Sequence, residues 1–505
     1  MPDLSLGSWT GRRARMSPDR VAVAYGDREW TYADLHERTG RVAAALAGLG
    51  VGPADRVAYL GPNHPAFLET LFGTARLGAT FVPLNWRLAV PELVHILRDS
   101  GARVLVAGAD QEPAATRLRE LLDIRTVLVG AAYEGLLAAA GAPPEATVDG
   151  TAPCLILYTS GTTGRPKGAV LTHDNVTWNC LNLLLDVDLA ADEVTLVVAP
   201  MFHVAALNQT VLPTLLKGGR VLLVPSFDPQ RCLELIARHR VTYLFGVPTM
   251  FRAMTRAPGW PTADLSSVRS AICGGAPVPV AVIADYQARG VTFMQGYGLT
   301  EASPGVLMLR REYSASKAGA AGTPVFFGDV RLVRPDGRPA APGEPGEILV
   351  RGPTVMAGYW GLAAETARTV TADGWLHTGD VGVADEEGFV TVRDRTKDVI
   401  ISGGENIYPA EVEDALYRHP AVAECAVIGV PDAHWGEVGR AVVVARTGAE
   451  PEPAELLDFL ADRIARFKVP KSVVFTDVLP RTASGKVVKS DLRARFGPGR
   501  KETAP

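Results

Sequence analysis

The segment CLILYTSGTTGRPKG, residues 154–168, joins an apolar strand to a turn that is rich in glycine and hydroxyl side chains and ends with a lysine. Backbone amides that a ligand can approach closely, hydroxyl donors and an ammonium group are what a polyphosphate needs from a protein. A Walker loop would require Gly-Lys-Ser/Thr where this chain has Gly-Arg-Pro. An ordinary surface turn would explain any three of these residues, but not the whole run. The segment therefore predicts a nucleotide-binding loop at the end of a strand.

Amphipathic helices and short apolar runs alternate on both sides of this loop. Thr31 is a suitable N-cap for the first long helix, which carries Leu35, Val42 and Leu46 on one face. Such alternation predicts parallel strands joined by helical crossovers, and hence an α/β fold. The other expected elements are strands at 56–60, 80–84, 102–107, 154–158, 220–224, 241–245, 270–274 and 291–295, and helices near 65–77 and 91–99.

The length of 505 residues predicts more than one domain, since single cores stop growing at roughly 250–300 residues. From about Gly319 the strands shorten and turn signals multiply, which favours an antiparallel or barrel-like extension. We expect a large N-terminal α/β domain with a small barrel-like part, residues 1–394, and a small α+β C-terminal domain, residues 395–505.

Composition excludes several classes of protein. Hydrophobic residues make up 47% and charged residues 21% of the chain, which is typical of soluble globular proteins, and the net charge of −4 does not favour nucleic acid as a partner. The five scattered cysteines fit neither a metal site nor a disulfide framework. Polar residues interrupt the apolar stretch 194–216, so we expect buried core there. The N-terminus resembles no secretion signal, and a cytoplasmic location is expected.

Templates for other enzyme classes fail. The chain has no Gly-x-Gly-x-x-Gly dinucleotide turn, no Gly-x-Ser-x-Gly nucleophile elbow and no His-Glu-x-x-His metal motif. Dehydrogenase and serine-hydrolase interpretations thereby lose their main support.

The loop resembles the nucleotide loop of the adenylate-forming superfamily, which includes acyl-CoA synthetases, coumarate-CoA ligases, firefly luciferase and peptide-synthetase adenylation domains. Overall, the chain most resembles bacterial fatty-acid–CoA ligases, with aryl-acid ligases second. The resemblance implies ATP, Mg²⁺ and CoA as cofactor and substrates. Matching motifs follow in family order: MFHVAAL at 201, GGAP at 274, QGYGLTE at 295, GWLHTGD at 374, RDRTKDVIISGGENIYPAE at 393 and PRTASGK at 480.

Roles for the ATP site follow from these motifs. The Tyr297 ring can cover an adenine, and the carboxylate of Glu301 is a natural ligand for Mg²⁺. The resemblance places Thr300 at the α-phosphate and Asp380 with Arg395 at the ribose, although an unplaced Asp and Arg would ordinarily form a surface ion pair. The remaining ATP-binding residues implied are Thr159, Ser160, Gly161, Thr162, Thr163, Gly164, Lys167, Gly275, Ala276, Pro277, Gln295, Gly296 and Gly298.

The sequence indicates the residues that bind the acid less specifically than those that bind ATP. An isolated histidine such as His203 is more often a satisfied core residue, but the resemblance implies that it positions the substrate carboxylate. The small residues of the implied acyl pocket leave room for a medium or long alkyl chain. An aryl acid is the alternative, as is delivery of the acyl group to a carrier protein or an amine. The acyl-pocket residues are His203, Gly274, Ala276, Gly298, Pro304 and Gly305.

The resemblance also implies two working arrangements of a mobile C-terminal domain. Lys486 would serve the adenylation step, Lys397 would act as the hinge, and Gly403 and Gly404 would line the CoA tunnel after rotation. Nothing in the sequence indicates an oligomeric state. An N-terminal cluster allows weak contact with an anionic membrane, although a solvated face is favoured; it consists of Arg12, Arg13, Arg15 and Arg20.

Overall fold

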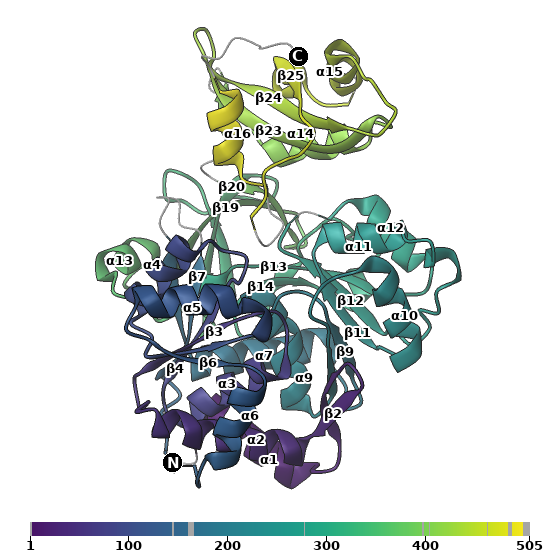
Figure 1. The fold of residues 1–505 in the computed structure, drawn as a ribbon. Helices are drawn as coiled ribbons and strands as arrows, with labels where there is room; N and C mark the ends of the chain where they lie inside the picture. The colour runs from purple at the N-terminus through teal and green to yellow at the C-terminus, as the bar shows by residue number, and fades with distance from the viewer. Residues whose placement is uncertain are drawn as a thin grey trace. The chain divides into compact units, whose positions relative to one another are not determined.

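A computed structural model describes residues 3–143, 146–159, 166–276, 278–395, 398–402, 405–461, 463–482 and 487–497. The chain divides into two compact units (Figure 1). The first unit comprises Met1–Val330 and Val350–His377, and the second Arg331–Leu349 and Thr378–Pro505. The predicted domain boundary between residues 394 and 395 stays a prediction, and the predicted hinge Lys397 lies outside the described residues.

A seven-stranded sheet forms one half of the first unit. Strands β4, β3, β5 and β6 run parallel, as the alternating pattern predicts, whereas β8 pairs antiparallel with both β7 and β18. The strands are, in sheet order, β18 (Gly358–Tyr359), β8 (Lys167–Thr172), β7 (Pro153–Thr159), β4 (Thr80–Leu84), β3 (Arg56–Leu60), β5 (Val104–Ala107) and β6 (Arg125–Leu128).

A nine-stranded sheet forms the other half. Its central strands β13, β12, β11, β9, β10 and β1 are parallel, and antiparallel strands complete both edges. The strands are, in sheet order, β15 (Thr323–Pro324), β14 (Gly305–Leu309), β13 (Phe293–Gly298), β12 (Ser270–Gly274), β11 (Tyr243–Gly246), β9 (Val194–Val197), β10 (Arg220–Leu223), β1 (Val21–Tyr25) and β2 (Arg28–Thr31).

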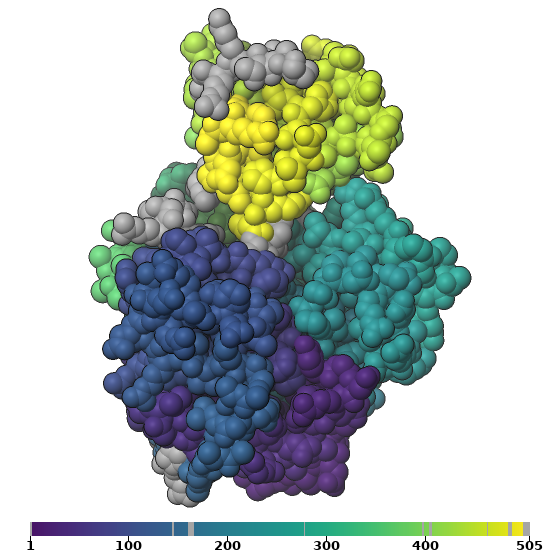
Figure 2. Space-filling view, viewed as in Figure 1, coloured from purple at the N-terminus to yellow at the C-terminus, as the bar shows by residue number. Residues whose placement is uncertain are grey.

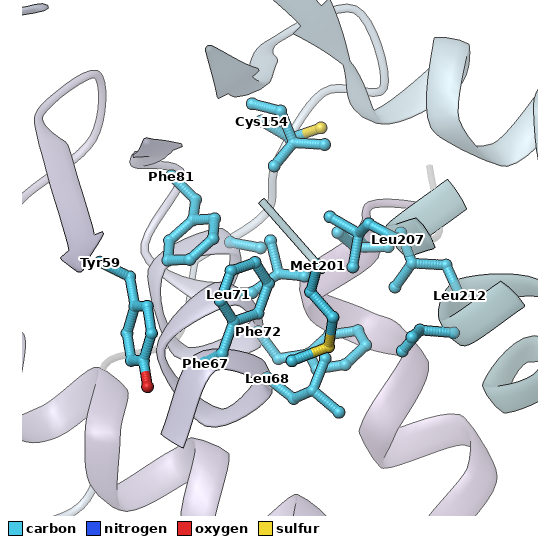
Figure 3. Packing of buried hydrophobic residues seen from close by; sticks show 14 of the residues in the cluster. Tyr59, Phe67, Leu68, Leu71, Phe72, Phe81, Cys154, Met201, Leu207 and Leu212 are labelled. Carbon is cyan, nitrogen blue, oxygen red and sulfur yellow. The ribbon is translucent and has the colours of Figure 1, made fainter. Parts of the chain in front are cut away.

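Helices fill the space between the two sheets and cover their outer faces. The central core unites apolar residues of both sheets with those of α2 (Tyr32–Gly48), α3 (Pro65–Arg76), α7 (His173–Val187) and α9 (Leu212–Lys217). Figure 3 shows Phe67, Leu71 and Phe72 of α3 packed among Phe81 of β4, Met201 and Leu207. The first unit is therefore one body in which α3 is buried along nearly its whole length.

Two further apolar clusters lie on the outer faces. One packs α4 (Val90–Ser100) and α5 (Glu112–Leu121) on the seven-stranded sheet. The other packs α10 (Pro229–His239), α11 (Pro248–Thr255) and α12 (Val280–Gln287) on the nine-stranded sheet. In Figure 2 the two halves are visible as adjoining blue and teal masses. The unit's remaining helices are α1 (Trp9–Met16), α6 (Ala131–Ala139), α8 (Val204–Ala206) and α13 (Ala363–Thr369).

Local signals in the sequence explain how the helices begin. The hydroxyl of Thr31 accepts from the Asp34 amide at 3.1 Å, so Thr31 caps α2 as predicted. The Asp34 carboxylate accepts from the Thr31 amide at 2.8 Å, which completes a capping box. The stretch 194–216 is buried core, as expected, and contains a π-helical turn, Leu207–Val211. No helix among the described residues is long and apolar enough to cross a membrane.

The second unit contains most of a four-stranded sheet and an α+β part. The four strands are β16 (Asp329–Val333), β17 (Pro345–Arg351), β19 (Leu376–Ala384) and β20 (Val390–Arg395), of which β19 and β20 pair antiparallel. The α+β part has its own cores. Its elements are β21 (Ile400–Ser402), β22 (Glu405–Ile407), α14 (Pro409–Tyr417), β23 (Val422–Asp432), β24 (Gly436–Ala445), α15 (Pro453–Ala461), β25 (Ser472–Phe475) and α16 (Lys489–Phe496).

Candidate active site

The predicted residues that follow or end strands of the nine-stranded sheet share one edge of that sheet. Strands β9, β11, β12 and β13 are parallel neighbours, so their carboxyl ends share that edge. His203 follows β9, Gly274 ends β12 and Gly298 ends β13. Ligands of open α/β sheets bind beyond the carboxyl ends of the strands, so the topology brings these motifs together.

Glycines at this edge are required by close approaches of the backbone. A Cβ on Gly298 would lie 1.7 Å from the carbonyl oxygen of Pro304, and a Cβ on Gly274 would lie 3.0 Å from that of Gly296. Gly275 has a φ of +84°, which other residues rarely adopt. Ala276 follows in the same turn, whereas Pro277 lies outside the described residues.

The segment predicted to be the nucleotide loop lies between two antiparallel strands, β7 and β8, in the sequence. Thr159 ends β7 and is the register partner of Lys167, which begins β8. The intervening Ser160, Gly161, Thr162, Thr163 and Gly164 lie outside the described residues. Because β8 separates the loop from α7, no helix begins directly after the loop. Amides, hydroxyls and Lys167, not the dipole of a following helix, would thus have to bind an anion.

Lys167 has an acidic partner that the sequence did not indicate. Its ammonium group forms an ion pair with Glu365 of α13, and the two side chains are 13% and 23% exposed. Its Nζ also lies 5.4 Å from the centre of the Tyr359 ring. Hydrogen bonds from Lys167 and Arg368 lower the pKa of Glu365. A polyphosphate that binds Lys167 would therefore compete with this carboxylate.

Glu301 likewise has a hydrogen-bond partner, Tyr359, which lies shortly before Glu365 in the chain. Glu301 lies in the 3₁₀ turn Thr300–Ala302, and the Tyr359 hydroxyl donates to its Oε1 at 2.9 Å. Burial and the neighbouring Glu301 raise the pKa of Tyr359, so the phenol remains a donor. The described residues contain no group of three or more His, Cys, Asp or Glu side chains suited to a metal. A single oriented carboxylate does fit Mg²⁺, which proteins commonly bind through one or two carboxylates and the phosphates of the substrate.

His203 is half-buried directly before α8. Its ring centre lies 4.5 Å from that of Phe202, and its carbonyl accepts from the Leu207 amide at 3.2 Å. Gln295 and Tyr297 belong to β13 itself, which extends to Gly298, beyond the predicted end of the strand at 295. The QGYG motif is therefore strand and not only turn.

In the second unit, Asp380 and Arg395, which the resemblance places at the ribose, form an ion pair. They are register partners on β19 and β20, and Arg395 Nε lies 3.2 Å from Asp380 Oδ1. The Asp380 side chain is 9% exposed and that of Arg395 47%. The Asp380 amide donates to Thr378 Oγ1 at 3.1 Å. This pairing fits either a ribose site or a plain ion pair, so the predicted role remains a prediction.

A buried charge cluster beside Arg395 was missed by the sequence analysis. Lys489 Nζ lies 2.9 Å from Glu413 Oε1 and 4.0 Å from Asp394 Oδ2. Burial raises the pKa of Asp394; for Lys489 burial acts to lower the pKa, but Glu413 and Asp394 outweigh it and the pKa is raised. No local pattern signals this cluster, because its members come from β20, α14 and α16.

Several predicted residues cannot be placed. Lys486, Lys397, Gly403 and Gly404 lie outside the described residues, and their roles stay predictions.

Three of the four arginines of the N-terminal cluster donate to main-chain carbonyl groups. Arg13 Nε donates to the Leu216 carbonyl at 2.8 Å, Arg12 to that of Asp3 at 2.5 Å, and Arg20 to that of Ala191. These contacts give the arginines a structural role within the chain.

The fold and the ordered motifs define an adenylate-forming enzyme, and the chain belongs to the AMP-binding enzyme family. Residues 11–360 match that family and residues 411–486 match the AMP-binding enzyme C-terminal domain. The predicted superfamily and the α/β fold class are thereby confirmed. The chain is an acid–thiol ligase of the acyl-CoA synthetase class.

Three relatives illustrate the range of acids in this family. The chain is 56% identical to a feruloyl-CoA synthase of an Amycolatopsis species over 98% of this chain and 100% of the relative. It is 43% identical to an indoleacetate–CoA ligase of Aromatoleum aromaticum, covering 97% and 98% of the two chains. It is 38% identical to a long-chain-fatty-acid–CoA ligase of Mycobacterium tuberculosis, again covering 97% and 98%.

Solved structures agree over the same length. ATP-bound MatB from Rhodopseudomonas palustris has a TM-score of 0.90 and 32% identity, covering 97% of this chain and 99% of that one. An o-succinylbenzoate-CoA synthetase from Bacillus subtilis in complex with ATP and magnesium has a TM-score of 0.87 and 33% identity, covering 96% and 99%.

Proposed function

We propose that this protein is an ATP-dependent aryl-acid–CoA ligase. It forms the acyl-adenylate of an aromatic carboxylic acid, releases pyrophosphate and then transfers the acyl group to CoA. The observation that carries the choice of acid is the 56% identity to a feruloyl-CoA synthase over nearly the whole chain. This replaces the fatty-acid substrate favoured by the sequence analysis with its aryl-acid alternative.

The surroundings of the predicted acyl pocket support an aromatic ring as ligand. A Cβ on Gly274 would lie 3.7 Å from Phe245, and one on Gly305 would lie 3.8 Å from Val325. Both neighbours belong to a cluster of buried apolar side chains that includes Met294 and Met308. Polarisable methionine sulfur packs favourably beside aromatic rings, so a flat acyl group suits this environment.

The chemistry requires activation of the acid before a thiol can attack. In the first step a carboxylate oxygen attacks the α-phosphorus of ATP, and the bond to pyrophosphate breaks. In the second a thiolate attacks the acyl carbon, and the bond to AMP breaks. Lys167 and Thr300 would bind phosphate oxygens during the first step, and His203 would orient the carboxylate. Mg²⁺ held at Glu301 would neutralise charge that develops on the phosphates.

Two other assignments remain to be tested against this one. A fatty acid is supported by the 38% identical long-chain-fatty-acid–CoA ligase. A carrier protein or an amine is the alternative acceptor, and the role of Gly403 and Gly404 in a CoA tunnel stays a prediction. A cytoplasmic location stays a prediction.

Pyrophosphate release by the purified enzyme tests the proposal. The acids are ferulate, cinnamate, benzoate, indoleacetate, octanoate and palmitate, each with and without CoA. We expect CoA-dependent turnover with at least one aryl acid, with kcat/KM about tenfold or more above that for either fatty acid, a difference of about 1.4 kcal/mol in transition-state binding. A preference for octanoate or palmitate would refute the aryl-acid assignment, and an adenylate that forms without reacting with CoA would refute CoA as acceptor.

A further inference from the structure

A short segment that ends in β18 joins the two halves of the first unit beside the candidate site. The Met356 amide donates to the Glu301 carbonyl at 2.9 Å, in the turn that follows β13. In β18, Tyr359 is the register partner of Ala169 on β8. The segment therefore connects the turn that carries the predicted metal carboxylate to the strand that begins with Lys167.

The side chain of Tyr359 contacts two groups that are predicted to bind the ligand. Its hydroxyl donates to Glu301 Oε1 at 2.9 Å, and the centre of its ring lies 5.4 Å from Lys167 Nζ. The Tyr359 amide donates to Thr366 Oγ1 at 2.9 Å, and this bond and the pairing with β8 fix the main chain that carries the ring. The hydroxyl is therefore held in a defined place relative to β8.

The carboxylate of Glu301 depends on this hydroxyl for its orientation. The Met356 amide fixes the main chain at Glu301, but the last torsion of a glutamate side chain has only broad preferences. Among the residues that the structure describes, the Tyr359 hydroxyl is the one hydrogen-bond partner of this carboxylate. An ionised carboxylate accepts such a bond more strongly than a neutral acceptor does. The bond occupies Oε1 and leaves Oε2 for a cation.

We propose that Tyr359 is a positioning residue for magnesium, whose hydroxyl holds the Glu301 carboxylate in the orientation that binds the Mg²⁺ of the ATP complex. The inference rests on the proposed function and on the predicted role of Glu301. Groups that orient a metal ligand contribute about 10–100-fold to metal affinity. Tyr359→Phe removes the bond to Glu301 but keeps a ring that Lys167 can contact, so it isolates the hydroxyl.

The experiment measures how much a metal strengthens nucleotide binding, in the absence of turnover. The probe is α,β-methylene-ATP, in which a P–C bond replaces the bond that adenylation breaks. Calorimetry gives its Kd with Mn²⁺ and with EDTA, and the ratio of the two Kd values is the metal gain. Tyr359→Phe should lower the metal gain by about tenfold or more, and should change the Kd in EDTA by less than about twofold.

Two results would overturn the proposal at this stage. One is a wild type whose Kd is the same with Mn²⁺ and with EDTA, because no metal then needs positioning. The other is a Tyr359→Phe variant that keeps the metal gain of the wild type, whether or not its Kd in EDTA has changed. An equal weakening with and without metal belongs to this second result and would show a general structural role.

Glu301→Gln identifies the group through which the hydroxyl acts. It removes the charge that attracts the metal but keeps an oxygen that can accept from Tyr359. It should therefore lose at least as much of the metal gain as Tyr359→Phe does, and the double variant should lose no more than Glu301→Gln alone. Retention of the gain in Glu301→Gln, or a further loss in the double variant, would mean that the hydroxyl acts on another group.

A second pair of a tyrosine and a glutamate supplies the matched control. The Tyr133 hydroxyl donates to Glu69 Oε2 at 2.8 Å, and neither residue belongs to a motif of the candidate site. Tyr133→Phe should lower the melting temperature and leave the metal gain unchanged. If Tyr133→Phe lowers the gain as Tyr359→Phe does, the loss reports stability alone and the proposal fails. Failure of the proposed function looks different, because it would change the preferred acid or acceptor, and neither is present in these measurements.

Discussion

Charged side chains at the candidate site are paired with other residues of the same chain. Lys167 pairs with Glu365, and Asp380 pairs with Arg395. Each pairing holds a long side chain in one place before a ligand arrives. Ligand binding must then share or exchange these partners, so the effect of a mutation depends on the residue that is left behind.

Replacement of Lys167 would test this dependence. Lys167→Ala should raise KM for ATP, partly because the carboxylate of Glu365 remains near the phosphates with Arg368 as its remaining partner. Lys167→Ala combined with Glu365→Gln should recover part of that loss, and Lys167→Ala alone should cost less turnover than Lys486→Ala. ATP titrations of pyrophosphate release on the three variants provide the measurement. Additive losses in the double variant would contradict the pairing.

The motif residues of the site could be predicted from the sequence. The residues that pair with them could not. Motif positions follow from local sequence, and parallel strands bring strand ends to a common edge. Glu365 is 198 residues from Lys167, and Tyr359 is 58 residues from Glu301. One sequence carries no signal for such long-range contacts, because surface glutamates and partly buried tyrosines are common.

A buried histidine should make the stability of the first unit depend on pH. His173 is 0% exposed, its Nδ1 accepts from the Leu6 amide at 3.1 Å, and burial lowers its pKa to about 4. The unfolded chain takes up this proton near the ordinary value of 6.5, whereas the folded chain does not. Between pH 6.5 and 4 the unfolded state therefore binds more protons, and stability falls as the pH falls, by at most about 3 kcal/mol.

His173→Asn tests this dependence, since Asn keeps an acceptor for Leu6 but does not titrate. Urea midpoints of wild type and variant between pH 7 and 4.5 isolate the histidine, because carboxylates contribute equally to both. The difference should shrink or reverse toward acid pH. Parallel curves would show that His173 does not titrate in this range.

At the scale of the elements, helices α2 and α3 approach each other closely at Gly73. A Cβ on Gly73 would lie 2.6 Å from Val42 Cγ1 and 3.2 Å from the Ala43 amide nitrogen. Helix propensity alone favours alanine over glycine by about 1 kcal/mol. Packing outweighs propensity here, because the neighbours are the backbone and a branched side chain on the buried face of α2.

Two glycine-to-alanine substitutions should therefore change the stability of the protein in opposite directions. Gly73→Ala should destabilise the protein by about 1–3 kcal/mol through overpacking. Gly135→Ala is the matched control, since Gly135 lies inside α6, is exposed and would place a Cβ in open space. It should stabilise by about 0.5–1 kcal/mol. Thermal melts of both variants decide the comparison; stabilisation by Gly73→Ala would mean that α2 and α3 readily separate.

The pattern of elements was predicted better than their pairing. Apolar periodicity gave most of the parallel strands and the helix that Thr31 caps, because both signals are local. The antiparallel strand β8 was missed, since a glycine-rich turn followed by KGAVLT does not distinguish a hairpin from the start of a helical crossover. The π-helical turn was missed because its five residues, LNQTV, carry no local signal that distinguishes a π-helical turn from an α-helix.

At the scale of the whole molecule, each of the two units has a core of its own. Separate cores allow two parts to rearrange without unfolding. The predicted hinge and the predicted mobile lysine concern this rearrangement, and both lie outside the described residues.

Two variants should separate the half-reactions. Lys486→Ala should abolish acyl-adenylate formation yet leave thioester formation from supplied acyl-AMP nearly intact. Lys397→Pro should do the converse, since proline fixes φ at the proposed pivot and restricts the preceding residue. Pre-steady-state acyl-AMP bursts and acyl-AMP-initiated thioester assays make the comparison. Parallel losses in both assays would rule out the rotation.

The second unit consists of two separate segments of the chain, so its parts are synthesised at different times. The ribosome delivers Arg331–Leu349 first, then the part of the first unit that follows it, and only afterwards Thr378–Pro505. Strand β17 is thus made before its neighbour β19 in the same sheet. Until the later strand emerges, β17 presents an unpaired edge to the cytosol of any host that expresses the gene. A nascent chain stalled between these strands is the stage at which misassembly or chaperone capture is most favoured.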